Sequence, residues 1–145
     1  MKFKPLWVVL LLPLLAGCLG RAAETPSAVV AKFCALDFAG QRLSSQGFLR
    51  IAPLVSYPAE TGWDTAIGIT GYRIVGASES GAHAEVRVAY DIDRSWPARI
   101  ENLLPYATTT FRLTLTGGRW RISQPIMYPR VSAGLLCRQY GYCSR

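Results

Sequence analysis

The sequence predicts an α+β fold in which N-terminal helices pack on an antiparallel sheet of about four strands. Two observations lead to this prediction. Between residues 26 and 55 apolar residues recur at helical spacing, whereas from residue 65 onward they alternate with polar residues, as in strands. The pair Gly117-Gly118 separates two such alternating runs and predicts a hairpin. The helices therefore come first and the sheet follows, within one domain.

The first helix is expected over residues 26–38. Thr25 can cap its free amides, Pro26 suits the first helical position and Gly40 suits its end. Cys34 lies beside the apolar stripe and is expected to behave as a small core residue. Asp37, close to the end of the helix, is expected to cap it or to face solvent.

One or two short helices are expected over residues 41–55, because Gly47 weakens the helical pattern there and Pro53 ends it. The strand pattern begins at residues 65–76, where Gly71 shifts the alternation and predicts a bulge. After a turn at 78–81, residues 82–90 alternate between an apolar face and a face that carries His83. These two segments are predicted to form a hairpin.

Residues 91–105 are expected to form a long connection with a helical turn near 99–104. The second hairpin follows, with strands over 108–116 and 119–128. A two-residue turn pairs apolar residues on one face and polar or basic residues on the other. The predicted pairs are Leu115 with Trp120, Leu113 with Ile122, Phe111 with Gln124, Thr114 with Arg121 and Arg112 with Ser123.

The first eighteen residues predict a lipid anchor. Lys2 and Lys4 precede an apolar run over 6–15, which is too short for a membrane-spanning helix. The run ends in a lipobox, in which Cys18 would receive the lipid after cleavage; its preceding residues are Leu15, Ala16 and Gly17. The alternative is an ordinary secretory peptide cleaved between Ala16 and Gly17.

This interpretation divides the chain into a signal peptide (1–17), a lipidated cysteine and tether (18–24), the α+β domain (25–130) and a cysteine-containing tail (131–145). The expected location is the bacterial cell envelope. By resemblance to lipoprotein sorting in Gram-negative bacteria, Leu19 favours the periplasmic face of the outer membrane in such a host.

Positive charge is concentrated late in the chain. The sequence carries 16 basic and 9 acidic residues, and no acidic residue follows Glu101. The basic side chains Arg112, Arg119 and Arg121 are expected to form a basic face, either merely solvated or in contact with an anionic lipid, a wall polymer or an envelope protein. Nucleic acid is not an expected partner of a tethered envelope domain.

Lipidation of Cys18 would leave three cysteines for an oxidising compartment. A disulfide between Cys137 and Cys143 is favoured, because Gly141 lets the chain bend between them. Pairing of Cys34 with either of these is the alternative. Two cysteines without histidine partners make a poor zinc site, so no metal and no cofactor are expected.

The opening helix and the final Phe-Arg-Leu-Thr-Leu-Thr-Gly-Gly-Arg-Trp-Arg-Ile hairpin resemble the nuclear transport factor two-like superfamily over residues 25–128. Small lipid-anchored members are common in it. The resemblance implies a strongly curved sheet that wraps a helix into a cone with a pocket, and it places Trp120 inside. The tail after residue 130 departs from that pattern.

Three tyrosines, Tyr72, Tyr90 and Tyr106, are candidate residues for the rim of such a pocket. No catalytic residue is assigned, because His83, Asp37 and the Asp91/Asp93 pair show no convergent acid/base arrangement. Trp63 and Trp96 lie in predicted loops, where they could contact a partner or a sugar polymer.

The sequence therefore favours a non-catalytic, membrane-anchored envelope lipoprotein whose domain binds a ligand or a partner. The alternative is a small enzyme that uses the pocket for acid/base chemistry.

Overall fold

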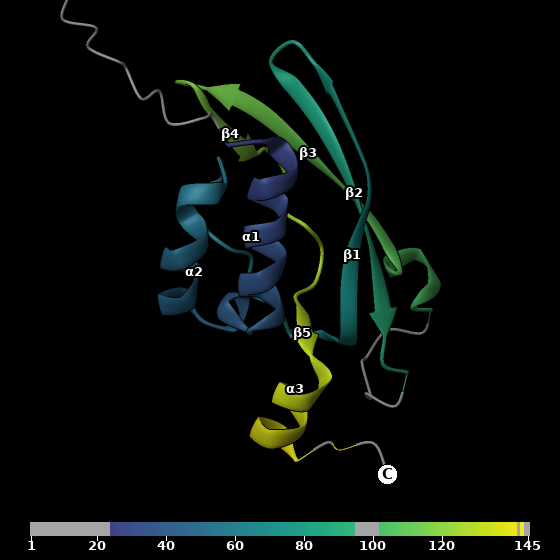
Figure 1. Cartoon of the computed structure of the whole chain (residues 1–145). Coiled ribbons are helices and arrows are strands. Elements are labelled where there is room, and N and C mark those ends of the chain that lie inside the picture. The colour runs from purple at the N-terminus through teal and green to yellow at the C-terminus, as the bar shows by residue number, and fades with distance from the viewer. Residues whose placement is uncertain (1–23, 95–101, 142, 144–145) are drawn as a thin grey trace, which may run out of the picture.

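The computed structural model describes residues 24–94, 102–141 and 143, which form an α+β fold with helices on one face of a curled sheet (Figure 1). The elements in chain order are α1 (Pro26–Phe38), η1 (Gln41–Leu43), α2 (Ser45–Ile51), η2 (Ala52–Leu54), β1 (Ile67–Ser80), β2 (His83–Ile92), η3 (Leu104–Tyr106), β3 (Thr108–Thr116), β4 (Arg119–Ile122), β5 (Arg130–Ser132) and α3 (Ala133–Tyr140). The α+β class predicted from the sequence is confirmed.

The helix α1 has the bounds that its capping residues predict. The Oγ1 of Thr25 accepts a hydrogen bond from the amide of Ala28, and Pro26 occupies the first helical position. Gly40, with a φ of 77°, turns the chain into η1. The helix packs across the concave face of the sheet, where the ring of Phe33 meets that of Phe111 edge to face at 5.4 Å.

The antiparallel part of the sheet follows the predicted register closely. Leu115 pairs with Trp120, Leu113 with Ile122 and Thr114 with Arg121. The strand β4 ends at Ile122, so Phe111 and Gln124 do not pair. The predicted bulge at Gly71 is present, and a second shift occurs between Ile74 and Gly76. These shifts bend β1 along its 14 residues.

The sheet has a fifth strand that the sequence does not predict. Its order is β4-β3-β2-β1-β5, and β5 lies parallel to β1. The chain then continues into a third helix, α3, so that residues 131–140 are packed parts of the fold. Val131 and Leu136 are buried there against Ala66 and Leu135, in a small second core. The expectation of about four strands is therefore only roughly correct.

The main core lies between α1, α2 and the concave face of the sheet. Its members are the buried apolar side chains Val29, Val30, Phe33, Cys34, Phe48, Ile51, Val55, Ile67, Ile69, Ala84, Val86, Val88, Tyr90, Phe111, Leu113, Trp120, Ile122 and Ile126. Among the described residues, α1 and α2 lie on the concave side of the sheet, and neither covers its opposite face (Figure 1). Among the described helices, none has the length and apolar character needed to cross a bilayer.

Candidate functional site

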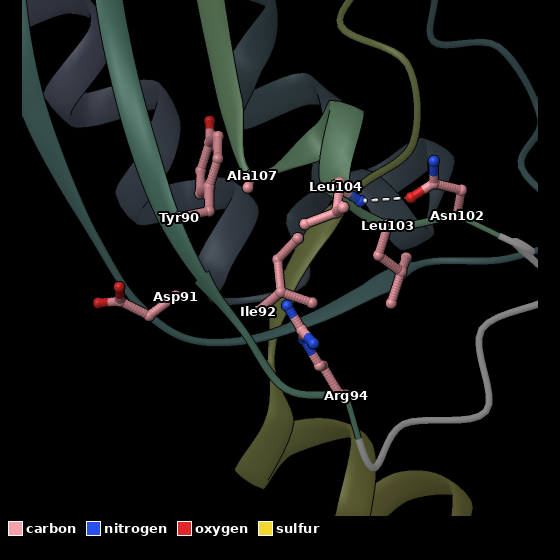
Figure 2. A pocket seen from close by; sticks show the side chains of 8 residues that line it. All are labelled: Tyr90, Asp91, Ile92, Arg94, Asn102, Leu103, Leu104 and Ala107. Carbon is pink, nitrogen blue, oxygen red and sulfur yellow. Dashed lines mark hydrogen bonds between the residues drawn. The ribbon is translucent and has the colours of Figure 1, made fainter.

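A pocket of about 650 Å³ opens where the C-terminal end of β2 meets the segment around η3 (Figure 2). Both elements are needed to form it: Tyr90 and Ile92 come from β2, and Leu103, Leu104 and Ala107 flank η3. A backbone hydrogen bond of 2.8 Å from the amide of Tyr90 to the carbonyl of Ala107 joins the two sides. Volume and lining are typical of a site for a small molecule.

The polar groups of this pocket lie mostly at its edge. In Figure 2 the guanidinium of Arg94 extends toward Ile92, whereas the carboxylate of Asp91 lies apart from the apolar side chains. Asp91 belongs to the opposite sheet face and accepts a 3.3 Å hydrogen bond from Arg73. The Asn102 side chain accepts a 3.0 Å hydrogen bond from the amide of Leu104, the first residue of η3. The pocket lining is therefore mixed, with the apolar side chains of Ile92, Leu103 and Leu104 beside nearly as much polar surface.

Of the three predicted rim tyrosines, only Tyr90 is a described lining residue of this pocket. Tyr72 is its cross-strand neighbour on β1 and packs edge to face on Phe38, with ring centroids 5.8 Å apart. Tyr106 turns toward Tyr128 instead, at 5.5 Å. The structure thus brings Tyr72 and Tyr90 together as cross-strand neighbours, and the rings of Tyr90 and Tyr106 both lie near the guanidinium of Arg130, at 5.0 and 6.0 Å.

Behind Tyr90 lies a buried ionic cluster that we define as Asp37, Arg42, Glu60 and Arg130. Arg42 is its centre, with a side chain that is 0% exposed. Its Nε and Nη2 donate to the two carboxylate oxygens of Glu60, at 2.8 and 2.9 Å. Its Nη1 donates to Oδ2 of Asp37 at 3.3 Å. Such paired, charge-assisted bonds satisfy a guanidinium that water cannot reach.

The second arginine of the cluster, Arg130, holds the chain segment that leads into β5. Its Nη1 donates to the carbonyls of Met127 and Tyr128, and its amide donates to Oδ2 of Asp37 at 3.0 Å. Arg42 also donates to carbonyls of this segment, those of Ile126 and Tyr128. Tyr128 has a φ of 57°, which is strained for a residue with a side chain. The two arginines therefore fix a strained, irregular segment through its carbonyl groups.

Tyr90 connects the cluster with the pocket. The guanidinium of Arg130 lies 5.0 Å from the centre of the Tyr90 ring, and the Tyr90 hydroxyl lies 3.7 Å from the sulfur of Cys34. Burial raises the pKa of the Cys34 thiol to about 12. A thiol with such a pKa stays protonated, so Cys34 is an inert core residue, as its place in the first helix predicts.

The expectation that Asp37 caps the helix or faces solvent is wrong. Asp37 is 2% exposed, and its Oδ1 has no hydrogen-bond partner. Burial raises the pKa of this carboxyl to about 6, although Arg42 and Arg130 both oppose the shift. The sequence analysis did not identify Arg42, Glu60 or Arg130 as site residues, because the local pattern around each one predicts an ordinary charged residue on the surface.

The remaining titratable candidates lie apart from the pocket interior. His83 is exposed at the start of β2, and the pocket lies at the end of that strand. Asp93 donates its amide to the carbonyl of Gly68 and follows β2 directly. Within residues 24–94, 102–141 and 143, no group of three or more histidine, cysteine or acidic side chains could hold a metal ion.

The three arginines of the predicted basic face lie on neighbouring strands. Arg112 of β3 is exposed and forms an ion pair with Glu85 of β2, with 3.3 Å between Nε and Oε1. Arg119 and Arg121 belong to β4, where Arg121 pairs with Thr114. The positive charge on this face is therefore smaller than the number of arginines suggests.

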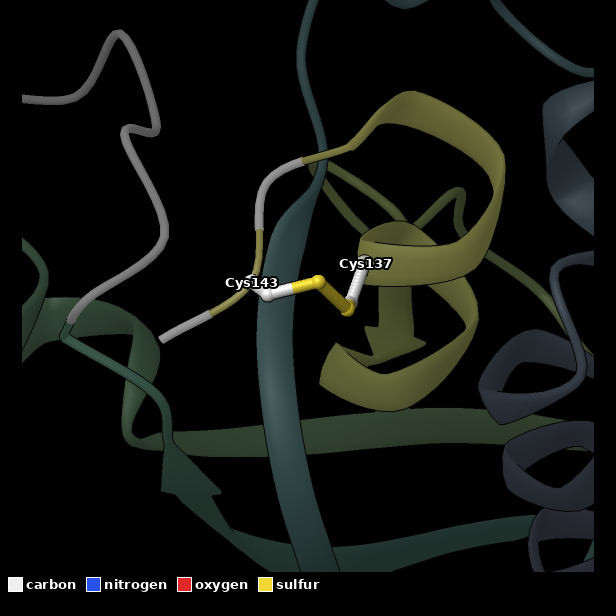
Figure 3. The surroundings of a disulfide bond; sticks show 2 residues. All are labelled: Cys137 and Cys143. Atoms are coloured by element: carbon white, nitrogen blue, oxygen red, sulfur yellow. A yellow bond between two sulfur atoms is a disulfide. The ribbon is translucent and has the colours of Figure 1, made fainter. Parts of the chain in front are cut away.

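A disulfide joins Cys137 in α3 to Cys143 (Figure 3). Gly141 ends α3 with a φ of 72°, and this lets the chain turn back toward the helix. The cysteine pair is the one that the sequence favours, and Cys34 stays a free thiol. The lipobox residues Leu15, Ala16, Gly17 and Cys18 lie outside the described residues, as do Trp96 and the helical turn predicted near residue 99.

Comparisons with known proteins give little that is similar to this chain. No family model matches it, and no curated protein matches it. A solved structure of a SEC-C motif containing protein from Rhodopseudomonas palustris matches with 18% sequence identity and a TM-score of 0.37. The match covers 72% of this chain and 79% of that protein.

The resemblance to lipid-anchored members of the nuclear transport factor two-like superfamily is wrong: no family model, of that superfamily or of any other, matches the chain. The final hairpin explains the error. Its alternation and Gly117-Gly118 turn are what any curled antiparallel hairpin requires, and they do not distinguish one α+β family from another. The lipidation of Cys18 was inferred from other residues, those of the lipobox, and stays a prediction.

Replacement of Arg42 by alanine is expected to lower the free energy of unfolding by about 3–5 kcal/mol, because it removes the counter-charge of two buried carboxylates and the donor to the carbonyl of Ile126. Urea unfolding followed by circular dichroism measures the change. The matched control is Arg50→Ala in α2, whose side chain is exposed and which should change stability by less than about 0.5 kcal/mol. Equal effects of the two variants would show that the cluster does not stabilise the fold.

Asp37 is expected to make stability depend on pH. Because the folded-state pKa is raised from 3.8 to about 6, the folded chain holds this proton more tightly than the unfolded chain does. Its contribution to stability is full below pH 4 and is lost as the pH rises through 6. The free energy of unfolding of the parent chain minus that of Asp37→Asn should fall by about 1–3 kcal/mol over this range.

Urea unfolding at steps between pH 4 and pH 7 measures this difference. Asp64→Asn is the control, since it removes a negative charge from an exposed position. A difference for Asp37→Asn that stays flat, or that rises with pH, contradicts the assignment.

Proposed function

We propose that this chain is a non-catalytic binding protein of the bacterial cell envelope, which takes up a small ligand with apolar and polar parts in the pocket beside Tyr90. The observation that carries the proposal is the pocket itself, with about 650 Å³ of space and an interior lined in part by the apolar side chains of Ile92, Leu103 and Leu104. Ligand sites in proteins combine such an interior with a few polar groups at defined places. Here Arg94 and Asn102 supply those groups at the edge.

The pocket is built for binding on elements that are held in place. Tyr90 lies between Arg130 and Cys34, and the amide of Leu104 at the start of η3 donates a hydrogen bond to Asn102. Leu104 is 68% exposed although it is a large apolar residue, so contact with an apolar ligand would remove its surface from water. Each fully buried leucine of this size stabilises a complex by roughly 1.5–3 kcal/mol.

We propose the envelope location from the residues at positions 15–18 and from the tail. A lipid on Cys18 would hold the domain at a membrane, and in a Gram-negative host Leu19 favours the periplasmic face of the outer membrane. The disulfide between Cys137 and Cys143 supports this proposal, because such bonds persist in oxidising compartments. Arg119 and Arg121 on the exposed strand β4 would favour additional contact with an anionic lipid or with an envelope protein.

The alternative, a small acid/base enzyme, has less support. Its candidate groups are divided among three places: His83 at the far end of β2, Asp37 inside the ionic cluster, and Asp91 paired with Arg73 on the other face. Acid/base catalysis needs two such groups that converge on one reacting atom. The pocket geometry therefore favours binding.

Binding in the pocket is expected to depend on Leu104 and not on other exposed leucines. The probe is 1-anilinonaphthalene-8-sulfonate, whose fluorescence rises in an apolar site. Leu104→Glu should weaken its saturable binding about tenfold, because the carboxylate takes the place of apolar contact and repels the sulfonate. Leu49→Glu is the matched control, since Leu49 is 70% exposed on α2, away from the pocket. Equal weakening by both variants would contradict the pocket as the site.

The anchor is tested by metabolic labelling of the expressed chain in bacteria with an alkyne analogue of palmitate. Label is expected on the parent chain and in the membrane fraction, because the thiol of Cys18 is the acceptor. Cys18→Ser should carry no label and should keep its leader, whereas Cys34→Ser should be labelled normally. A parent chain that stays unlabelled contradicts the anchor while leaving the pocket proposal intact.

A further inference from the structure

A second hollow, which we call the Trp63 cleft, lies outside the pocket described above. Its volume is about 400 Å³. Its lining combines an ion pair, aromatic rings and hydroxyl groups, from Arg42, Glu60, Phe48, Trp63, Ser44, Ser45 and Thr61. It forms where η1 and the start of α2 face the loop before β1. No lining residue is shared with the pocket beside Tyr90.

The floor of the cleft is charged but electrically balanced. Glu60, with a side chain only 9% exposed, accepts two hydrogen bonds from Arg42. Behind this pair, Asp37 and Arg130 complete the ionic cluster, so two cations face two anions. A balanced floor gives no net attraction for an ion, and it would leave a buried charged ligand without a counter-charge. An uncharged ligand therefore suits the cleft.

The same floor can still accept a hydrogen bond. Oε1 of Glu60 accepts from Nη2 of Arg42 and from Nε1 of Trp63, both at 2.9 Å. Oε2 accepts one bond, from Nε of Arg42 at 2.8 Å. Because each carboxylate oxygen has two lone pairs, Oε2 retains an acceptor site, and a hydroxyl group is the uncharged donor that fits it.

The walls of the cleft combine aromatic rings with hydroxyl groups. Trp63 packs on the guanidinium of Arg42 at 5.6 Å and on the ring of Tyr128 at 5.5 Å, so its ring is held in place before a ligand arrives. The side chain of Phe48 lies on another wall. Ser45 and Thr61 are exposed and supply hydroxyls that both donate and accept.

We propose that the Trp63 cleft binds an uncharged sugar ring, such as one unit of a wall glycan. A sugar ring has C–H faces that pack on aromatic rings and a rim of hydroxyls that matches the carboxylate and hydroxyls of the cleft. The proposal goes beyond the pocket beside Tyr90 and does not depend on it, because the two sites share no lining residue and suit different chemistry.

The test is a titration of the full-length ¹⁵N-labelled chain with glucose, N-acetylglucosamine, cellobiose and diacetylchitobiose, followed by NMR. At least one sugar should give saturable shifts of the indole Nε1–H of Trp63 and of the Thr61 and Gly62 amides. The Trp63→Phe variant assigns the indole signal. The Ile92 and Leu103 amides, in the other pocket, should not move. Anilinonaphthalene sulfonate should shift the Ile92 and Leu103 amides and leave the Trp63 indole unchanged. Each proposal can therefore be contradicted without affecting the other.

The variant Ser45→Ala/Thr61→Val should weaken the sugar about three- to tenfold, since each lost hydrogen bond contributes modestly. Ser80→Ala/Thr110→Val makes the same chemical changes on strands β1 and β3 and should leave the affinity unchanged. The proposal is overturned if none of the four sugars gives a saturable shift, if the shifts lie elsewhere, or if both double variants weaken binding equally. It is also overturned if sulfate ion shifts the Trp63 indole as the sugars do.

Discussion

The hydrogen bonds that two buried arginines donate to the carbonyls of residues 126–128 are the constraint on which the rest of the fold depends. This segment joins β4 to β5 without regular secondary structure, so its carbonyls have no strand or helix partner. Arg42 and Arg130 supply the missing donors. Since a buried arginine needs a counter-charge in turn, Asp37 and Glu60 belong to the same constraint.

The position of the C-terminal part follows from that segment. Once its carbonyls are held and Tyr128 has turned through its positive φ, Arg130 is placed to pair with Ile67 in a parallel strand. Parallel pairing between strands far apart in sequence has no tight turn to set its register, so something else must set it. Here the amide of Arg130 donates to Asp37, and this bond fixes β5 relative to α1. The position of β5 in turn determines where α3 and its disulfide lie.

How much of this could be read from the sequence depends on the range of the interaction. The strands β3 and β4 were predicted with their mutual register, and β2 was predicted as a strand, because period-two alternation and a Gly-Gly turn are local signals. The helix α1 was predicted from Thr25, Pro26 and Gly40 for the same reason. The strand β5 was missed because three residues carry no periodicity and their partner lies some sixty residues earlier. The ligand pocket was only anticipated through Tyr90, since Leu103 and Leu104 belong to a connection without a pattern.

The ionic cluster left one local trace, and it lies in the first helix. Val30, Cys34 and Asp37 are spaced by four and three residues, so the carboxylate of Asp37 falls on the same stripe as buried side chains. A charge on the buried face of a helix requires a buried partner of opposite charge. The partner is then an arginine whose own local sequence predicts an exposed position. The spacing does not indicate which of the many arginines is the partner of Asp37. Arg42 and Arg130 qualify only because the folded chain brings residues 5 and 93 positions away to one carboxylate.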